Sequence, residues 1–147
     1  MPRKVVLLVE DNADDRDLTL RAFERNRLDV SVDVAADGEE ALAYLLGRDR
    51  DGPPRPLPAV VLLDLNLPGV DGLAVLRRMR AAERTRRLPV VVLTSSGEDR
   101  DLVQSYDLGA NSYVRKPVSF TDFMEASRQL GVYWLVLNEA PPEVARG

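Results

Sequence analysis

The chain has 147 residues, a length at which a single domain is the usual outcome. Hydrophobic residues make up 45% and charged residues 30% of the sequence, which predicts a packed core beneath a charged surface and excludes a disordered chain. Twenty basic and 24 acidic side chains give a net charge of −4, which disfavours nucleic-acid binding because such surfaces are usually basic. We therefore interpret residues 1–147 as one globular domain.

Cysteine and histidine are both absent from the sequence. Without cysteine the chain has no disulfide, zinc-thiolate site, iron–sulfur cluster or thiol nucleophile. Without histidine it has no Ser-His-Asp triad and no imidazole ligand for zinc. Any chemistry must use carboxylates, amines, guanidinium groups, hydroxyls or the backbone, and any bound metal should be a hard cation such as Mg²⁺ or Ca²⁺.

The N-terminus carries a short apolar run at residues 5–9. Five residues are too few for a signal peptide or for a helix that spans a membrane. We therefore expect a cytoplasmic protein that does not contact a membrane.

Short apolar runs recur along the chain. Most are nearly continuous and rich in β-branched residues, which is typical of parallel strands covered on both faces. Segments with helical spacing separate them, so strand and helix alternate five times. This alternation predicts an α/β domain with a central parallel sheet. The expected strands are residues 5–9, 30–34, 59–63, 90–93 and 112–114.

Residues that cap helices mark where the expected helices begin. Asp37 and Glu40 have the spacing of a capping box. The fourth helix should carry Leu102, Val103 and Tyr106 as its apolar residues. A proline-rich stretch at residues 47–58 should form a helix-free connection, since proline disrupts helices. The other helices are expected to begin at Asp11 or Asn12, at Gly72, at Ser96 with Glu98, and at Ser119 with Asp122.

Polar residues follow four of the expected strands. In open parallel sheets, ligands bind beyond the carboxyl ends of the strands, so these residues should lie close together. Each alone has an ordinary structural explanation, but Asp64 directly follows a buried strand, where an unpartnered carboxylate is costly. A cluster of carboxylates indicates a divalent cation, and a carboxylate beside one could attack phosphorus, with an amine and a hydroxyl binding the phosphoryl oxygens. The residues are Glu10, Asp11, Asp64, Thr94 and Lys116.

Four segments resemble the receiver domain of two-component response regulators, in order and at the expected spacing. They are VVLLVEDNADD, VVLLDLNLPGVDGLAVL, VVVLTSS and GANSYVRKPVSF. The resemblance covers about residues 4–130 and leaves 131–147 as an extended C-terminal helix and tail. It implies a flavodoxin-like, doubly wound fold, (βα)5, whose five-stranded parallel sheet has the order 2-1-3-4-5.

The resemblance also implies the acceptor and its metal. Asp64 matches the aspartate that receives a phosphoryl group from a sensor histidine kinase. Asp11 matches a direct Mg²⁺ ligand, and Glu10 matches an acidic residue that acts through water. The backbone carbonyl of Asn66 matches the third protein ligand.

Further matches concern the response to phosphorylation. Thr94 matches the switch hydroxyl that moves toward the phosphoryl group, and Lys116 matches the lysine that pairs with that group. Tyr113 matches the aromatic switch residue that turns inward. The peptide bond between Lys116 and Pro117 matches one that is cis in the family. Gly69 and Gly72 match the glycines of a tight turn behind the acceptor.

The end of the last helix, GVYWLVL, is apolar on all sides, although a helix packed on one face of a sheet needs only an apolar stripe. We favour a partner surface or a homodimer through Tyr133, Trp134 and Leu137, because Trp and Tyr are enriched at interfaces. The alternative is that these residues fold back under the stretch 47–58. The tail also resembles single-domain receivers that partner phytochrome histidine kinases, which implies a light input and a homodimer.

Only about seventeen residues follow Leu130, so we expect no output domain and a signal delivered by protein–protein contact. The main interpretation is a phosphoacceptor switch and not an enzyme. One alternative is a Mg²⁺-dependent phosphohydrolase with Asp64 as nucleophile, although Asn66 replaces the second aspartate that such enzymes use. Another is a dimeric adaptor that works without phosphorylation.

Overall fold

The computed structural model describes residues 4–25, 30–47 and 55–142. Its elements alternate between strand and helix, which confirms the α/β prediction. None of the helices in these three ranges is long and apolar enough to cross a bilayer. The strands are β1 (Lys4–Val9), β2 (Val30–Ala35), β3 (Val60–Leu63), β4 (Val90–Thr94) and β5 (Ser112–Arg115). The helices are α1 (Ala13–Arg25), α2 (Gly38–Leu46), α3 (Gly72–Ala81), α4 (Asp99–Asp107), α5 (Phe120–Gly131) and a π-helical segment, η1 (Val132–Leu137).

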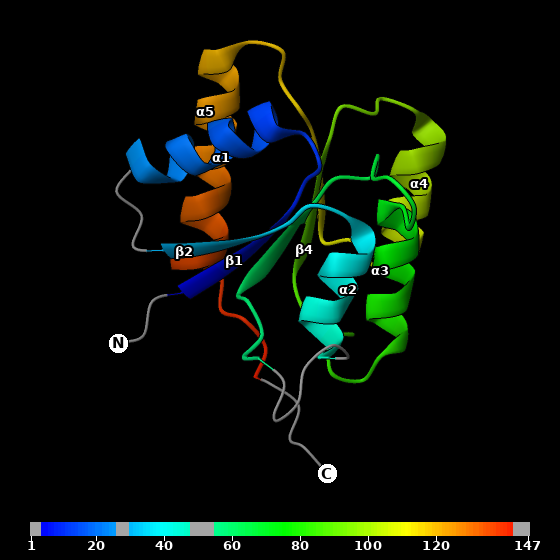
Figure 1. The fold of residues 1–147 in the computed structure, drawn as a ribbon. Coiled ribbons are helices and arrows are strands. Elements are labelled where there is room, and N and C mark those ends of the chain that lie inside the picture. The colour runs from blue at the N-terminus through cyan, green and yellow to red at the C-terminus, as the bar shows by residue number, and fades with distance from the viewer. Residues whose placement is uncertain (1–3, 26–29, 48–54, 143–147) are drawn as a thin grey trace.

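The five strands form one parallel sheet in the order β2-β1-β3-β4-β5, as predicted. Helices α1 and α5 cover one face, and α2, α3 and α4 cover the other (Figure 1). In the register of the sheet, Val9 pairs with both Ala35 and Leu63. The next residues, Glu10 and Asp64, therefore leave the same edge of the sheet side by side.

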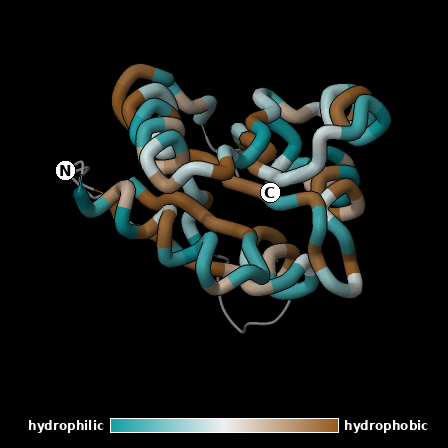
Figure 2. Tube along the Cα trace, turned by 90° about the horizontal axis from the view of Figure 1, so that it is seen from above, coloured by the Kyte–Doolittle hydropathy of each residue, from teal (hydrophilic) through white to brown (hydrophobic). Residues whose placement is uncertain are grey.

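The three central strands explain the continuous apolar runs in the sequence. Side chains of β1, β3 and β4 point alternately into two cores, one on each side of the sheet, whereas the edge strands β2 and β5 are only partly buried. Leu76 and Met79 of α3 fill one core, and Phe23 of α1 belongs to the other. Figure 2 shows the hydrophobic strands running through the middle of the molecule.

Capping side chains fix where two helices begin. The N–H of Glu40 donates to Asp37 Oδ1 at 2.8 Å, and the Glu40 carboxylate accepts the N–H just before the cap at 3.2 Å. The first bond confirms Asp37 as the predicted cap, whereas the return bond from Glu40 goes to Ala36 and not to the cap itself, so the arrangement differs from a capping box by one residue. At the start of α1, the N–H of Asp15 donates to Asn12 Oδ1 at 3.0 Å. Asn12 is therefore the cap, and the Asp11 carboxylate remains available for another role.

Helix α4 is less buried than its sequence suggests. Leu102, Val103 and Tyr106 are 37%, 56% and 51% exposed, and only Ser105 of this helix is buried. The helix packs against α3 and the edge strand β5, where less sheet surface is available to cover. Its apolar residues therefore face solvent.

The apolar end of the chain is divided between core and surface. Leu135 of η1 is buried in the core beneath α1 and α5, and Trp134 packs against that core. Tyr133, Val136 and Leu137 are 51%, 65% and 69% exposed. Residues 55–58 of the proline-rich connection have no helix, and residues 48–54 lie outside the described part of the chain, so the fold-back alternative is not tested.

Candidate functional site

Asp64 follows β3 directly and is 6% exposed. The Thr94 hydroxyl donates to its Oδ1 at 2.9 Å, and the Lys116 ammonium donates to its Oδ2 at 3.0 Å. The backbone N–H of Asn66 adds a third hydrogen bond to Oδ1, at 3.1 Å. Both oxygens of this buried carboxylate are therefore held by donors from neighbouring strand ends.

The turn behind Asp64 depends on glycine. A Cβ added to Gly72 would lie 2.3 Å from the Asp64 carbonyl oxygen and 2.6 Å from Leu65 Cα. Gly69 has a φ of +69°, a left-handed conformation that glycine adopts without strain. The two glycines let α3 begin against the acceptor strand, as the tight turn in the sequence predicts.

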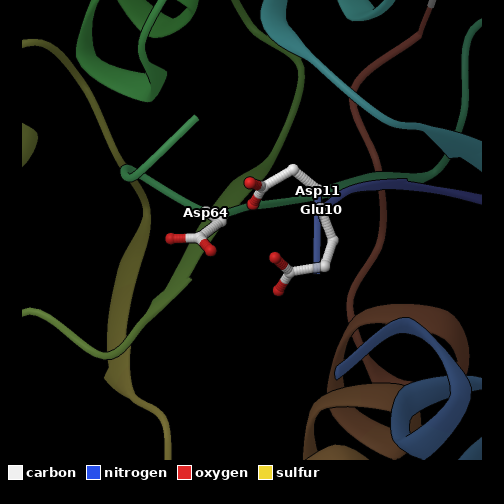
Figure 3. Close-up of side chains that lie close together, drawn as sticks. All are labelled: Glu10, Asp11 and Asp64. Atoms are coloured by element: carbon white, nitrogen blue, oxygen red, sulfur yellow. The ribbon is translucent and has the colours of Figure 1, made fainter. Parts of the chain in front are cut away.

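Three carboxylates gather beside the acceptor. Oxygens of Glu10, Asp11 and Asp64 all lie within 4.8 Å of one another, and Figure 3 shows these side chains gathered at the ends of β1 and β3. Such charges repel unless a cation or a proton neutralises them. The all-oxygen donor set fits a hard divalent cation, and the exposed Asp11 leaves it a route from solvent.

Lys116 supplies the positive charge of the site. Its Nζ donates to Glu10 Oε1 at 2.5 Å, to Asp15 Oδ2 at 2.7 Å and to Asp64 Oδ2 at 3.0 Å, and its side chain is only 8% exposed. An ammonium has three protons, so every donor is engaged. Sequence reasoning missed Asp15. As an acidic residue in the first turn of a helix, Asp15 has an ordinary explanation in the helix dipole, and no sequence signal pairs it with Lys116.

Burial and neighbouring charges shift the pKa values of Glu10, Asp64 and Lys116. Burial, together with the Asp64 carboxylate, raises the pKa of Glu10 to about 7 against the opposing effect of Lys116. Burial alone would also raise the pKa of Asp64, but hydrogen bonds from Asn66 and Glu10 and the charge of Lys116 outweigh it, and that pKa lies below its ordinary value. Burial opposes the charge on Lys116, but Asp15 and Glu10 raise its pKa. At neutral pH the acceptor is therefore a carboxylate, as a nucleophile must be.

The sequence of the whole domain agrees with this geometry. Residues 6–128 match the family model of the response regulator receiver domain. The chain belongs to this family. The receiver also resembles known proteins over nearly all of its length.

One relative is the probable methanogenesis regulatory protein FilR2 of Methanothrix harundinacea, 45% identical over 137 residues that cover 93% of this chain and 87% of FilR2. Response regulator Rcp1 of Synechocystis sp. is 36% identical over 91% of this chain and 90% of its own. The crystal structure of its Mn²⁺-bound form superposes with a TM-score of 0.86 at 34% identity, over 95% of this chain and 99% of that one.

The phosphorylated cyanobacterial phytochrome response regulator RcpA has a TM-score of 0.88 at 33% identity, over 96% of this chain and 100% of its own. Phytochrome response regulators are therefore among the structural neighbours of this receiver.

A chain of hydrogen bonds links the acceptor of this receiver to α4. Besides donating to Asp64, the Thr94 hydroxyl accepts the N–H of Ser96 at 3.4 Å. The Ser96 carbonyl accepts a hydrogen bond from the Tyr113 hydroxyl at 3.0 Å, and the Ser96 hydroxyl donates to the Asp101 carboxylate at 2.6 Å. A displacement of Thr94 would therefore reach both the half-buried Tyr113 and the first turn of α4.

One expectation about the receiver is wrong. The peptide bond between Lys116 and Pro117 was expected to be cis, but it is trans, as are all the peptide bonds in the described part of the chain. With a trans bond, the Lys116 N–H still donates to the Thr94 carbonyl at 2.7 Å and Nζ still reaches Asp64. A trans bond is also the lower-energy form for proline, by about 0.5–1 kcal/mol.

Proposed function

We propose that this receiver is a phosphoacceptor switch in which Asp64 accepts a phosphoryl group from a sensor histidine kinase. The proposal rests on one observation above all: a buried, ionised carboxylate is held between the Thr94 hydroxyl and the Lys116 ammonium. These two donors hold the carboxylate in a fixed orientation beside the acidic pair. As a switch, the chain is not an enzyme that turns over a substrate.

In the transfer, an Asp64 oxygen attacks phosphorus and forms the new P–O bond. The P–N bond to the donor imidazole breaks, and its electron pair returns to the imidazole nitrogen. Lys116 and Thr94 then donate to phosphoryl oxygens, where negative charge increases. The donor imidazole must belong to another molecule, because this sequence contains no histidine.

We assign the acidic cluster to Mg²⁺, with Asp11, Asp64 and the Asn66 carbonyl as ligands and Glu10 acting through water. The bound cation would neutralise part of the charge on the incoming phosphoryl group. Two findings support the assignment: the oxygens of Glu10, Asp11 and Asp64 lie close together, and the relative Rcp1 has been crystallised with Mn²⁺. Mn²⁺ and Mg²⁺ prefer similar oxygen ligands.

Phosphorylation would then be transmitted through Thr94. Once the acceptor carries a phosphoryl group, the Thr94 hydroxyl has a new acceptor and moves toward it. The hydrogen bond to Ser96 carries that movement to Tyr113 and to α4, whose apolar residues already face solvent. The output is a change in the surface formed by α4, β5 and α5.

The partner of this switch would be a histidine kinase of the phytochrome type, because phytochrome response regulators are among its structural neighbours. We further propose that residues 1–147 act in the cytoplasm as one domain, without binding nucleic acid or membrane. The exposed Tyr133 and Leu137 would form a homodimer interface, and Trp134 would support it from the core.

The direct test is labelling by acetyl phosphate with Mg²⁺. Asp64→Asn should abolish labelling, because an amide oxygen is a poor nucleophile toward phosphorus. Asp14→Asn, an exposed change in α1, is the matched control and should label like the wild type. Labelling of Asp64→Asn would overturn the acceptor assignment. Release of many phosphates per chain from small phosphate esters would instead support the phosphohydrolase.

A further inference from the structure

Lys116 has one partner that neither the proposed metal site nor the phosphoacceptor explains. Asp15 Oδ2 lies 2.7 Å from Lys116 Nζ, closer than the 3.0 Å of Asp64 Oδ2. We propose that Asp15 is a positioning residue that holds the Lys116 ammonium beside the acceptor during phosphoryl transfer. The inference rests on the proposed function and names a further residue of the same site.

Two hydrogen bonds at the start of α1 fix the backbone of Asp15. Its N–H donates to the capping oxygen of Asn12 at 3.0 Å, and its carbonyl accepts the Thr19 hydroxyl at 2.9 Å. The Asp15 side chain is 28% exposed, so water competes only in part for its carboxylate. The ion pair therefore joins the hydrogen-bonded first turn of α1 to the loop after β5, 101 residues later.

The other two partners of Lys116 are expected to change their interactions during function. Glu10 belongs to the acidic cluster, and Asp64 becomes an acyl phosphate. Asp15 belongs to neither group, so its contact with the ammonium can persist throughout. Lysine is a flexible side chain with a point charge, and a short carboxylate side chain on an anchored helix turn keeps that charge directed at the phosphoryl group.

A carboxylate in the first turn of a helix also stabilises the helix dipole, whatever else it does. Asp14 shares that turn, is exposed and forms no ion pair with a described residue. Replacing Asp14 therefore removes the same charge from the same helix end without touching Lys116. The comparison separates positioning from a general charge effect.

The test measures the initial rate of labelling by acetyl phosphate at saturating Mg²⁺. Asp15→Asn and Asp15→Ala should slow labelling about tenfold, the scale of one charge-assisted hydrogen bond. Asp14→Asn should stay within about twofold of the wild type, and Asp15→Glu should recover most of the lost rate. Thermal unfolding of each variant checks that the fold is intact.

A second readout follows the ammonium itself, in the metal-free protein and without phosphodonor. The Lys116 NH₃⁺ signal in ¹⁵N NMR should be sharp in the wild type and in Asp14→Asn, and should broaden in Asp15→Ala as the group moves and exchanges faster. Wild-type labelling and a sharp Lys116 signal in Asp15→Ala would overturn the inference, as would an equal loss of rate in Asp14→Asn. If wild-type protein does not label at all, the proposed function fails instead, whatever the NMR signal shows.

Discussion

Gly72 couples the stability of the fold to the geometry of the acceptor. In Gly72→Ala the added Cβ would meet the Asp64 carbonyl oxygen at 2.3 Å and Leu65 Cα at 2.6 Å. Both are backbone atoms, so no rotation of a side chain can relieve the contact, and either α3 or the acceptor strand must shift. We expect the free energy of unfolding to fall by about 3 kcal/mol, at the upper end of the usual range for overpacking.

Gly69→Ala is the matched control in the same turn. Its Cβ would meet no atom within 4 Å, so the change tests only the strain of a φ of +69° in alanine. We expect a loss of about 1 kcal/mol. Because Gly69 does not contact the acceptor, labelling of Asp64 should remain close to that of the wild type.

Both variants can be measured by urea unfolding followed through the fluorescence of Trp134, the single tryptophan, which packs against the core. Labelling by acetyl phosphate then reports the geometry of Asp64. Gly72→Ala should lose both stability and labelling. This expectation is refuted if the free energy of unfolding of Gly72→Ala lies within about 0.5 kcal/mol of the wild type, below the usual effect of overpacking, and the variant is labelled at the same rate. In that case α3 does not pack closely on the acceptor strand.

Three more outcomes are expected. Burial holds the pKa of Glu10 near 7, above its ordinary 4.5, so this group favours folding below pH 4.5 and the effect is lost as pH rises through 7. In EDTA, the free energy of unfolding measured with urea should fall by about 1–3 kcal/mol between pH 5 and 8. In Glu10→Gln the free energy of unfolding should not change over this pH range, and an equal fall in this variant would contradict the assignment to Glu10. Tyr133→Ser with Leu137→Asp should convert a dimer to a monomer on a sizing column, whereas Val103→Asp on α4 should not; unchanged elution of the double variant would count against the interface. Tyr113→Phe removes the hydrogen bond to Ser96 and should preserve labelling while altering the α4 amide signals in NMR upon phosphorylation; unaltered α4 signals would argue against this route.

The secondary structure could be predicted because each element carries its own signal. Continuous apolar runs mark strands that are covered on both faces, and the pair Asp37 and Glu40 marks a helix start through local hydrogen bonds. Helix α4 shows the limit of that reasoning. Apolar residues at helical spacing indicate which residues share a face, but whether that face is covered depends on the neighbouring elements.

The pattern of amino acids was sufficient to predict the chemistry at the strand ends. Parallel strands end at one edge, so the order of the residues along the chain was enough to gather Asp11, Asp64 and Thr94 there. The folded structure was needed to place Asp15 beside Lys116, to show that Asn12 caps α1, and to show which residues of the apolar C-terminal segment are buried. The cap is a local contact, but Asp11 and Asn12 are both good capping residues, so the sequence alone could not separate them. The other two outcomes depend on distances between side chains far apart in the sequence, which packing sets to within a hydrogen-bond length and a one-dimensional pattern does not contain.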